Sequence, residues 1–457
     1  MKRISGEYLA SLINYPQQET FSRIDIDHIT IDSRKVDSSS LFVALKGECL
    51  DGHDFIQDAI NMGSPLILAS ISEKAKVLRA LAHTQTQVML VDCPLTSLQL
   101  MAKRHIEKAT SLHKIGITGS VGKTTTKEIL SSILEIDARI AKTIGNFNSE
   151  IGLAISAFEV EENSEFAIFE MGVDKIGEME TMVDIFTPHT AIITNIGLSH
   201  IGKMGSMENI ATQKGKIFHS SINSAFMNEV SKWKNYITKD KHLPLTTFGL
   251  KSMPYITHIT SLNLHGWKFF YRGIEVHLKG IGKHTLIDAL GAIKIAESLG
   301  INSFSIAEGL HQYRGLKGRS QVTSGRVTII EDWYNSSVDS TSQILQCMKM
   351  APCEGDKRVV LGSMKEMGSY TKRAHEMVAK DIELSQMEHV YLYGEEMYTT
   401  YKALKKNRSE KSIFYTDEYQ HLEQAMLRDT KIGDLVLLKG SRAMQMERLV
   451  PFMRSIR

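Results

Sequence analysis

The chain has 457 residues, of which 42% are hydrophobic and 23% charged, and its formal net charge is +2. This length predicts two to four domains with substantial apolar cores. The near-neutral charge argues against binding to nucleic acid or an anionic membrane surface, so we expect neither as a partner. No stretch approaches about 18 consecutive apolar residues, and we therefore expect no membrane span. Four cysteines without Cys-x-x-Cys spacing predict free thiols and a cytoplasmic protein.

Short apolar segments alternate with turn-rich connections in the first 95 residues. Segments 41–45 and 66–69 contain Leu, Ile, Val, Phe and Ala, a composition typical of buried strands. We expect a separate N-terminal domain of mixed α/β structure over residues 1–95.

A glycine-rich turn lies between an apolar strand and an amphipathic helix at residues 116–126. Glycines let backbone N–H groups approach phosphate oxygens, and the helix N-terminus adds partial positive charge. Lys123 is placed to reach the terminal phosphates, and the Thr124 hydroxyl to hold Mg²⁺. The strict Walker spacing requires glycine at position 117, where this chain has Ile117. The surrounding strand and helix still predict a site for ATP or a close relative.

Two further apolar runs in the central region, 166–170 and 191–195, predict buried strands, with a helix near 178–186 between them. Glu170 ends the first run and His200 follows the second. Ligands of open parallel sheets bind at the carboxyl edge, so Glu170 is a candidate Mg²⁺ ligand or an ordinary strand-end glutamate. A single histidine is more often structural, and Lys214 by itself is typical of a solvated helix lysine. We expect a central domain over 96–312.

The strand–helix alternation restarts beyond residue 313 and predicts a doubly wound sheet over 313–457. The segment 313–319 is a plausible hinge before it. The predicted strands are 327–330, 359–361, 390–393 and 435–438, and the predicted helices lie near 340–350, 371–386, 395–406, 418–428 and 444–455.

Several motifs along the whole chain together resemble the Mur ligase family, the ATP-dependent amide-forming enzymes of peptidoglycan precursor synthesis. These motifs occupy residues 32–36, 41–47, 51–55, 118–124, 146–152, 170–172 and 199–206. The phosphate loop at 118–124 is similar to the family's own variant, in which position 117 is not glycine. The resemblance implies three α/β domains: an N-terminal uridine-nucleotide domain, a central P-loop ATPase-type domain with a parallel sheet, and a C-terminal Rossmann-like domain.

The C-terminal motifs, at 332–335, 361–368 and 439–442, look like those of the ligase that adds D-alanyl-D-alanine to UDP-N-acetylmuramoyl tripeptide. An alternative is the family member that adds the third, diamino acid residue, which normally carries Asp-Asn-Pro-Arg; this chain lacks that element. A second is the related folylpolyglutamate synthase, which has no place for the uridine-binding segments. A third is a nucleotide-binding switch, although no Asn-Lys-x-Asp guanine motif occurs.

The resemblance also implies roles for particular residues. It implies catalytic roles for Lys123, Lys214, His200 and Glu170, and metal ligation by Thr124, Glu170, His200 and Lys214. Nucleotide binding is implied for Gly119, Ser120, Gly122, Lys123, Thr124, Thr125, His284, Arg319, Asp332 and Asn335. Substrate binding is implied for Ser33, Arg34, Lys46, His53, Asn146, Asn148, Glu150, Tyr334, Lys439 and Arg442. The implied cofactors are ATP and Mg²⁺, with Lys214 carbamylated by CO₂, in a monomer acting on small molecules.

Three positions depart from the family pattern. Thr285 stands where an asparagine often contacts adenine, Ser363 replaces a frequent aspartate, and Ser337-Val338 replaces Asn-Pro. None lies in the phosphate loop or in the expected metal set, so we expect catalysis to be retained.

Overall fold

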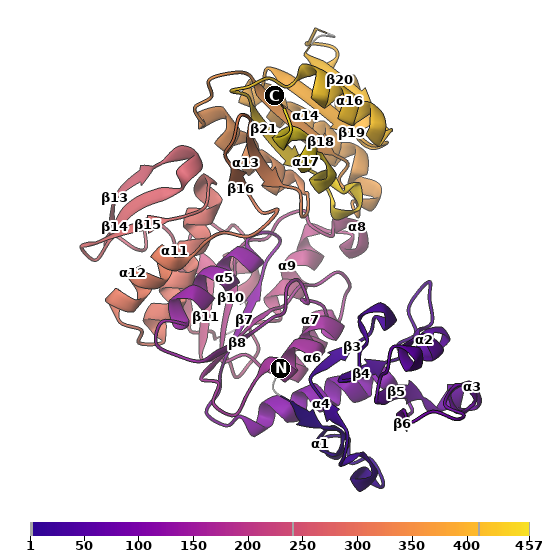
Figure 1. Cartoon of the computed structure of the whole chain (residues 1–457). Helices are drawn as coiled ribbons and strands as arrows, with labels where there is room; N and C mark the ends of the chain where they lie inside the picture. Colours follow the sequence, from indigo (N-terminus) through magenta and orange to yellow (C-terminus); the bar gives the residue numbers. More distant parts are fainter. Residues whose placement is uncertain (1–2, 240–241, 410–411, 457) are drawn as a thin grey trace. The chain divides into compact units, whose positions relative to one another are not determined.

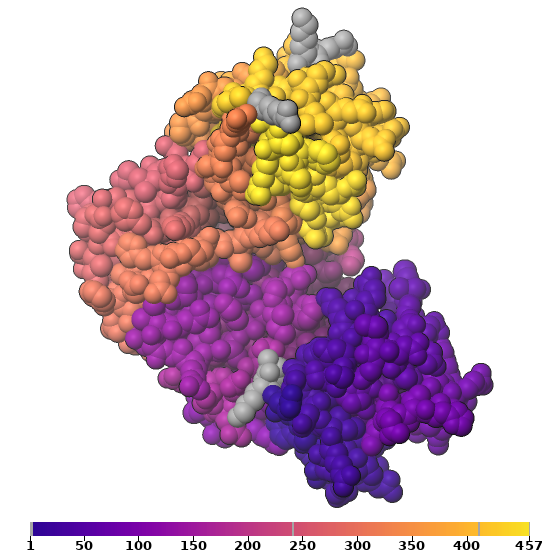
Figure 2. Space-filling view, viewed as in Figure 1, coloured from indigo at the N-terminus to yellow at the C-terminus, as the bar shows by residue number. Residues whose placement is uncertain are grey.

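The computed structural model describes residues 3–239, 242–409 and 412–456, in two compact units (Figure 1). The first unit comprises the described residues up to Gly116, together with Ala138–Gly172 and Gly177–Thr190. The second comprises Ile117–Asp137, Val173–Ile176 and the described residues from Ala191 onward. The space-filling view shows the N-terminal residues, in indigo, as a closely packed body (Figure 2).

The first unit contains a four-stranded parallel sheet in the order β3-β4-β5-β6. Its strands are β3 (His28–Thr30), β4 (Ser40–Val43), β5 (Leu66–Ser70) and β6 (Gln87–Val91). Every residue of β4 and β5 is buried, as expected for parallel strands covered on both faces. The predicted strand at 66–69 is therefore confirmed, and the strand predicted at 41–45 is confirmed up to Val43, where β4 ends. The helices of this region are α1 (Gly6–Ser11), α2 (Ile56–Asn61), α3 (Lys74–Ala80) and α4 (Pro94–Lys108). Two short strands, β1 (Ile4–Ser5) and β2 (Asp25–Ile26), pair in antiparallel orientation as a separate small sheet.

The central sheet has six strands in the order β12-β11-β10-β7-β9-β8. They are β7 (His113–Thr118), β8 (Ile140–Lys142), β9 (Phe166–Glu170), β10 (Thr190–Ile193), β11 (Ser224–Asn228) and β12 (Leu245–Phe248). β9 confirms the strand predicted at 166–170, and α7 (Glu178–Phe186) confirms the helix predicted near 178–186. β10 ends two residues before the predicted 195, because Thr194 and Asn195 turn to hold the phosphate loop.

Besides α7, the described residues of the central region form seven helices. They are α5 (Lys123–Leu134), α6 (Glu150–Ser156), α8 (Ile201–Met204), α9 (Met207–Gly215), α10 (Lys234–Thr238), α11 (Gly282–Ser298) and α12 (Ser303–Gln312). The apolar face of α5 packs against α11 and α12 (Figure 1). Side-chain caps fix two starts: Ser149 Oγ accepts from Gly152 N before α6, and Ser206 Oγ accepts from Asn209 N before α9.

A three-stranded antiparallel sheet was not predicted from the sequence. It consists of β13 (Ile256–Ser261), β14 (Trp267–Tyr271) and β15 (Ile274–Leu278). Short strands that alternate polar and apolar residues carry a weaker signal than buried runs, which explains the omission.

The C-terminal sheet has the order β16-β17-β21-β18-β19-β20, with β16 antiparallel and the others parallel. Its strands are β16 (Gln321–Thr323), β17 (Thr328–Asp332), β18 (Lys357–Gly362), β19 (His389–Tyr393), β20 (Ile413–Thr416) and β21 (Leu435–Lys439). Its helices are α13 (Val338–Met350), α14 (Thr371–Ser385), α15 (Met397–Leu404), α16 (Tyr419–Asp429) and α17 (Val450–Arg454). This arrangement confirms the α/β class and the doubly wound C-terminal sheet, while β16 and β20 were not predicted.

The prediction of a helix near 444–455 is wrong for the first half of this segment. Gln445 adopts a left-handed conformation with φ 50°, which an α-helix of L-residues does not accommodate. Single 3₁₀ turns surround it, and the α-helix α17 begins only at Val450.

In the part of the chain that the structure describes, we find no helix with both the length and the apolar character needed to cross a bilayer.

Candidate active site

The phosphate loop leads from the buried end of β7 directly into α5. Gly119 and Gly122 both have positive φ, 151° and 85°, a conformation that favours glycine. Lys123 is the first residue of α5, and its Nζ donates to Gly119 O at 2.8 Å across the loop. The loop therefore presents a helix N-terminus and a lysine ammonium together, the two features that bind phosphate.

Residues after β10 support this loop from one side. Asn195 Oδ1 accepts from Val121 N at 2.8 Å, and Thr194 Oγ1 donates to Val121 O at 2.6 Å. Ser120 Oγ donates to Gly197 O at 3.0 Å and accepts from Gly197 N at 2.8 Å. The sequence predicted Ser120 only as a nucleotide contact, whereas its hydroxyl is occupied in holding the loop.

A carboxyl group from α11 lies against the other side of the loop. Asp288 is buried and sits so close to Gly122 that a side chain at position 122 would collide with it. Burial raises the pKa of Asp288 well above its ordinary value. The raised pKa favours the uncharged form of the acid, which repels phosphate less than a carboxylate does.

Glu170 lies buried at the end of β9, as predicted. Its Oε1 accepts from Asn148 Nδ2 at 2.7 Å, and its backbone N donates to Thr143 Oγ1 at 2.7 Å. Asn148 O in turn accepts from Gly172 N at 2.7 Å. The structure thus brings together Glu170 and Asn148, which the sequence assigned to metal and substrate respectively.

Lys214 lies in α9 and is only 1% exposed. The sequence taken residue by residue suggested a solvated helix lysine, and that interpretation is wrong. A lysine this deeply buried is costly as an ammonium ion unless neighbouring groups compensate its charge.

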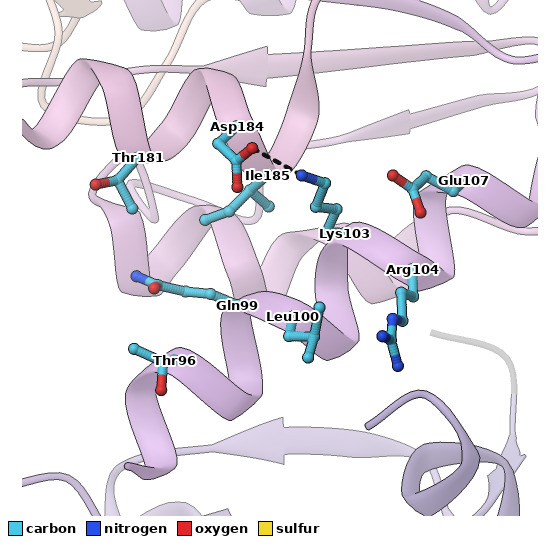
Figure 3. Close-up of a pocket in the computed structure, with 9 residues that line it drawn as sticks. All are labelled: Thr96, Gln99, Leu100, Lys103, Arg104, Glu107, Thr181, Asp184 and Ile185. Carbon is cyan, nitrogen blue, oxygen red and sulfur yellow. Dashed lines mark hydrogen bonds and ion pairs between the residues drawn. The ribbon is translucent and has the colours of Figure 1, made fainter. Parts of the chain in front are cut away.

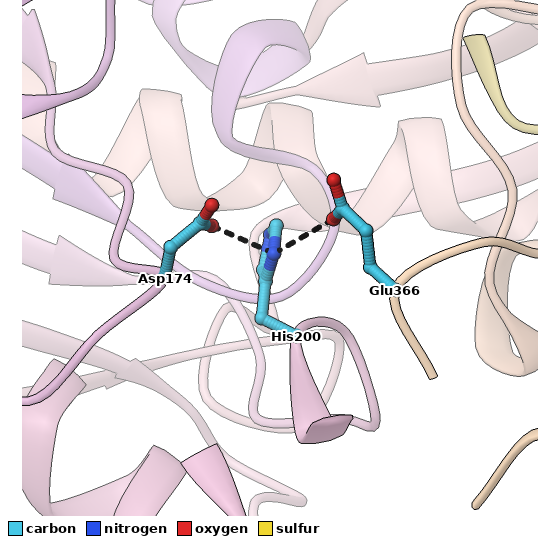
Figure 4. A group of neighbouring side chains, drawn as sticks. All are labelled: Asp174, His200 and Glu366. Atoms are coloured by element: carbon cyan, nitrogen blue, oxygen red, sulfur yellow. Dashed lines mark ion pairs between the residues drawn. The ribbon is translucent and has the colours of Figure 1, made fainter. Parts of the chain in front are cut away.

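His200 lies at the N-cap of α8 with a left-handed φ of 63°. Its Nδ1 is 2.7 Å from Asp174 Oδ1 and 3.3 Å from Glu366 Oε2 (Figure 4). Burial by itself lowers the pKa of His200, but the two carboxylates outweigh it and raise the pKa above the ordinary value. The Lys123 ammonium acts on the same ring and lowers the pKa, so the structure brings His200 and the phosphate loop into one electrostatic environment.

A second polar group forms where β17 and β21 end in the C-terminal sheet. Lys439 is buried, and its Nζ donates to Asp332 Oδ2 at 2.7 Å and to Asn335 O at 3.0 Å. Asp332 Oδ1 also accepts from Ser320 N at 2.9 Å. Burial lowers the pKa of the nearby His284. The charge of Asp332 acts in the opposite direction and raises this pKa, whereas the charge of Lys439 lowers it further, so His284 lies close to both groups. Lys439 therefore positions two residues predicted to bind nucleotide.

Aromatic rings hold the predicted arginines of the C-terminal region. The Arg319 guanidinium lies 4.0 Å from the centre of the Tyr334 ring. Arg442 lies 5.5 Å from the Trp333 ring centre, and its Nη1 is 2.8 Å from Glu447 Oε1. Stacking fixes a guanidinium plane while leaving its N–H edges for a ligand.

The predicted uridine-binding residues differ in exposure. Arg34 is exposed and paired with Asp32 at 2.8 Å, and Lys46 is also exposed. Ser33 and His53 are buried. Both ring nitrogens of His53 are engaged within the fold, Nδ1 with Asp51 Oδ1 at 2.6 Å and Nε2 with Ser70 N at 3.0 Å. His53 thus shapes this region from inside, while Arg34 and Lys46 face outward.

The remaining predicted residues have the following places. Thr124 is buried and Thr125 half-buried in α5, Asn146 is exposed, and Glu150 begins α6 half-buried. Of the three departures from the family pattern, Thr285 donates from Oγ1 to Ile281 O at 2.8 Å within α11. Ser337 Oγ caps α13 in a reciprocal pair with Ser340, so Ser337 has its own structural role.

Sequence reasoning missed three charged residues at the site. Asp174 and Glu366 contact His200, and Lys127 is buried in α5 with its Nζ 3.0 Å from Glu128 Oε1. Glu366 lies within the motif 361–368, and Asp174 lies in the connection that follows β9, but nothing in either segment indicates that it reaches His200.

A cavity of about 450 Å³ opens between α4 and α7 in the first unit (Figure 3). It is lined by Thr96, Gln99, Leu100, Lys103, Arg104, Glu107, Thr181, Asp184 and Ile185. Lys103 Nζ donates to Asp184 Oδ1 at 2.7 Å beside it. Because the basic and acidic groups of its lining are balanced and none is a predicted site residue, the cavity adds nothing to the chemistry.

Comparison with known proteins identifies the family of the chain. Three domain families match: the Mur ligase middle domain at residues 117–296, the glutamate ligase domain of Mur ligases at 318–442, and the Mur ligase family catalytic domain at 25–103. The UDP-N-acetylmuramoyl-tripeptide–D-alanyl-D-alanine ligase of Bacillus subtilis is 31% identical over 456 residues, covering 98% of this chain and 97% of the relative.

Solved structures show the same fold. The crystal structure of MurF from Acinetobacter baumannii superposes with a TM-score of 0.86 at 24% identity, covering 99% of each chain. The MurF ligase of Thermotoga maritima in complex with ADP superposes with a TM-score of 0.74 at 25% identity, covering 93% of this chain and 97% of that one. The fold and phosphate loop define a nucleotide-binding α/β enzyme, and the chain belongs to the Mur ligase family.

Proposed function

We propose that this protein is the ATP-dependent ligase that joins D-alanyl-D-alanine to UDP-N-acetylmuramoyl tripeptide in peptidoglycan precursor synthesis. The observation that carries the proposal is the likeness to ligases of this name over nearly the whole chain, 98% in the Bacillus subtilis case. The phosphate loop and the buried Glu170 supply the groups that phosphoryl transfer requires.

The reaction proceeds in two steps. The terminal carboxylate of the tripeptide attacks the γ-phosphorus of ATP, the bond to the ADP oxygen breaks, and an acyl phosphate forms. The amine of D-alanyl-D-alanine then attacks the acyl carbon, phosphate leaves with the C–O bonding electrons, and the amine loses a proton. Lys123 and the N–H groups at the start of α5 stabilise charge on the transferring phosphoryl group.

The residues present fit Mg²⁺ binding. Thr124 offers a hydroxyl and Glu170 a buried carboxylate, and hard oxygen donors of this kind suit Mg²⁺. When bound, Mg²⁺ would offset the repulsion between the triphosphate and the incoming carboxylate.

We further propose that Lys214 acts as a carbamate. Its neutral amine adds to CO₂, forming an N–C bond and releasing a proton, and the product is a carboxylate on a long side chain. This conversion suits a lysine that is almost fully buried in α9, because it replaces a buried cation by an anion able to bind Mg²⁺.

The reaction involves only small molecules, and we propose that the protein acts as a cytoplasmic monomer. The substrates of this step are soluble nucleotide and dipeptide compounds, and each unit has its own buried core. Analytical ultracentrifugation of the pure protein, with and without substrates, measures its molar mass and so tests whether it is a monomer.

The function is tested by assaying a set of acceptors and amine donors for ADP release and product mass. We expect turnover only with UDP-muramoyl tripeptide together with D-alanyl-D-alanine. Turnover with UDP-muramoyl dipeptide and a diamino acid would instead identify the ligase of the third residue. ATP hydrolysis that is independent of both substrates would favour a nucleotide-dependent switch.

A further inference from the structure

We propose that Asp339 is a positioning residue for the phosphate loop, on which it acts through the backbone of Gly197 and Leu198. Asp339 is not among the residues that the sequence assigned to nucleotide, metal or substrate. The proposal rests on the proposed function only in that the loop binds the phosphates of ATP. All the residues concerned belong to the second unit.

The segment that follows β10 holds the backbone of the phosphate loop near Ser120. Ser120 Oγ donates to Gly197 O at 3.0 Å and accepts from Gly197 N at 2.8 Å. Ser199 Oγ also donates to Ser120 O at 3.2 Å. The geometry of the loop around Ser120 therefore depends on where residues 197–199 lie.

A carboxylate from the C-terminal part of the chain contacts this segment directly. Asp339 Oδ2 accepts from Leu198 N at 3.1 Å. A Cβ atom at Gly197 would lie 2.1 Å from Asp339 Oδ2 and 2.9 Å from Asp339 Cγ. The φ of Gly197 is not positive, so the carboxylate, and not the backbone conformation, requires glycine there. Asp339 thus packs on the same residue that exchanges two hydrogen bonds with Ser120.

The start of α13 gives Asp339 a fixed backbone. Ser340 Oγ accepts from Ser337 N at 3.1 Å, and Ser337 Oγ accepts from Ser340 N at 3.4 Å, so the two serines cap the helix reciprocally. Asp339 lies between them in the first turn of α13, where a negative charge is favoured by the helix dipole. The carboxylate therefore meets Leu198 N from a well-ordered helix end.

The connection from β17 to α13 also carries residues predicted to bind nucleotide. β17 ends at Asp332, and Asn335 follows before α13 begins. Lys439 Nζ donates to Asp332 Oδ2 at 2.7 Å and to Asn335 O at 3.0 Å, which holds the connection against the end of β21. Residues 332–339 therefore join the predicted nucleotide contacts to the support of the phosphate loop.

The effect of Asp339 on the loop is indirect. The hydrogen bond to Leu198 N fixes Gly197, Gly197 fixes the hydroxyl of Ser120, and Ser120 fixes the loop whose N–H groups face the phosphates. A loop that is held in one geometry before binding loses less conformational freedom when phosphate binds. Asp339 should therefore increase the affinity of the protein for nucleotide without contacting it.

The test measures ADP binding to the full chain by isothermal titration calorimetry in the presence of Mg²⁺. We expect Asp339→Ala to bind ADP about tenfold more weakly than the parent, because Leu198 N loses its charged acceptor. Asp339→Asn keeps an acceptor oxygen and should bind within about threefold of the parent. Asp381→Ala is the matched control, because it removes a half-buried carboxyl group from the neighbouring α14, where the group is hydrogen bonded to Ser342. Its affinity should equal that of the parent.

A double-mutant cycle separates the contact with Gly197 from a general effect on α13. In the parent, Gly197→Ala forces a methyl group against the carboxylate and should weaken ADP binding about tenfold. In the Asp339→Ala protein the clashing carboxyl group is absent, and the next nearest atom, Ser120 Cβ, lies 3.5 Å from the methyl position. Gly197→Ala should then weaken binding no further, whereas additive losses would contradict the direct contact.

Equal ADP affinity in the parent and in Asp339→Ala would overturn the proposal, as would a parent that binds no ADP. If Asp339→Ala does not fold, as judged by circular dichroism, Asp339→Ser replaces it with the same expectation, because serine lacks the oxygen that meets Leu198 N. Ligation is assayed separately on the parent. A parent that ligates normally, with ADP binding that is independent of Asp339, refutes only the positioning role. ADP binding that depends on Asp339 in a parent that does not ligate D-alanyl-D-alanine refutes only the proposed function.

Discussion

Lys123 is the residue whose chemistry can be tested with the least effect on folding. Its ammonium lies across the phosphate loop, hydrogen bonded to Gly119 O, and is only half-buried, so its removal makes no core cavity. We expect Lys123→Ala to lower kcat by at least about 10²–10³-fold, because a preorganised charge on the transferring phosphoryl group is lost. Thermal unfolding should be unchanged, and near-normal turnover by a folded variant would refute the assigned role.

Lys214 provides a second test at the scale of one residue. We expect Lys214→Ala to lose most activity and to regain part of it when a small carboxylic acid in the buffer occupies the vacated position. Lys214→Arg should stay inactive, because a guanidinium forms no carbamate and keeps its charge. Mass spectrometry of the native protein in CO₂-rich buffer gives a reading independent of activity. Full activity of Lys214→Arg would disprove the carbamate.

The helix α4 contains a partly buried histidine that makes the stability of the folded protein depend on pH. Within it, His105 Nδ1 lies 2.7 Å from Tyr8 Oη, and Nε2 lies 2.9 Å from Val160 O. Phe158 stacks on the ring with centroids 4.9 Å apart. Burial lowers the pKa of His105 below its ordinary 6.5, with a smaller lowering from Lys108, against the hydrogen bond to Val160, which raises it.

The sign of the resulting pH dependence follows from proton binding. Below about pH 6.5 the unfolded chain takes up a proton on His105 that the folded protein does not, so the free energy of unfolding falls as pH falls from 6.5 to the folded pKa. We expect His105→Gln to show a smaller loss of Tm between about pH 7.5 and pH 5.5 than the parent. The exposed His421→Gln is the control, and an identical pH response in His105→Gln would contradict the prediction.

At the scale of the whole molecule, binding of the acceptor's uridine end is expected in the first unit, while the phosphate loop belongs to the second. Arg34, whose side chain is 86% exposed, and Lys46 offer positive charge suited to a diphosphate. We expect Arg34→Ala and Lys46→Ala to raise the KM for the acceptor more than they lower kcat, because the diphosphate is remote from the reacting carboxylate.

Steady-state kinetics with varied acceptor at saturating ATP measure this effect. The matched control is Lys35→Ala, a neighbouring lysine outside the predicted set. An unchanged acceptor KM in both Arg34→Ala and Lys46→Ala would remove these two residues from the substrate site.

The sequence by itself determined the α/β class, the phosphate loop and the place of Glu170 at a strand end. These features depend on contiguous residues: a buried run marks a parallel strand, and a glycine-rich turn before a helix marks a phosphate site. The resemblance to Mur ligases rests on motifs of the same local kind. The three domain boundaries and the roles of individual substrate-binding residues stay predictions.

Only the tertiary structure decided which side chains meet. The burial of Lys214, the close approach of Asp288 to Gly122, and the approach of Glu366 to His200 all depend on how distant segments fold together. Sequence patterns record the period of one element, whereas the convergence of side chains depends on the path of the whole chain. A lysine on a helix therefore has the same local pattern whether it faces water or an active site, and its surroundings alone decide its chemistry.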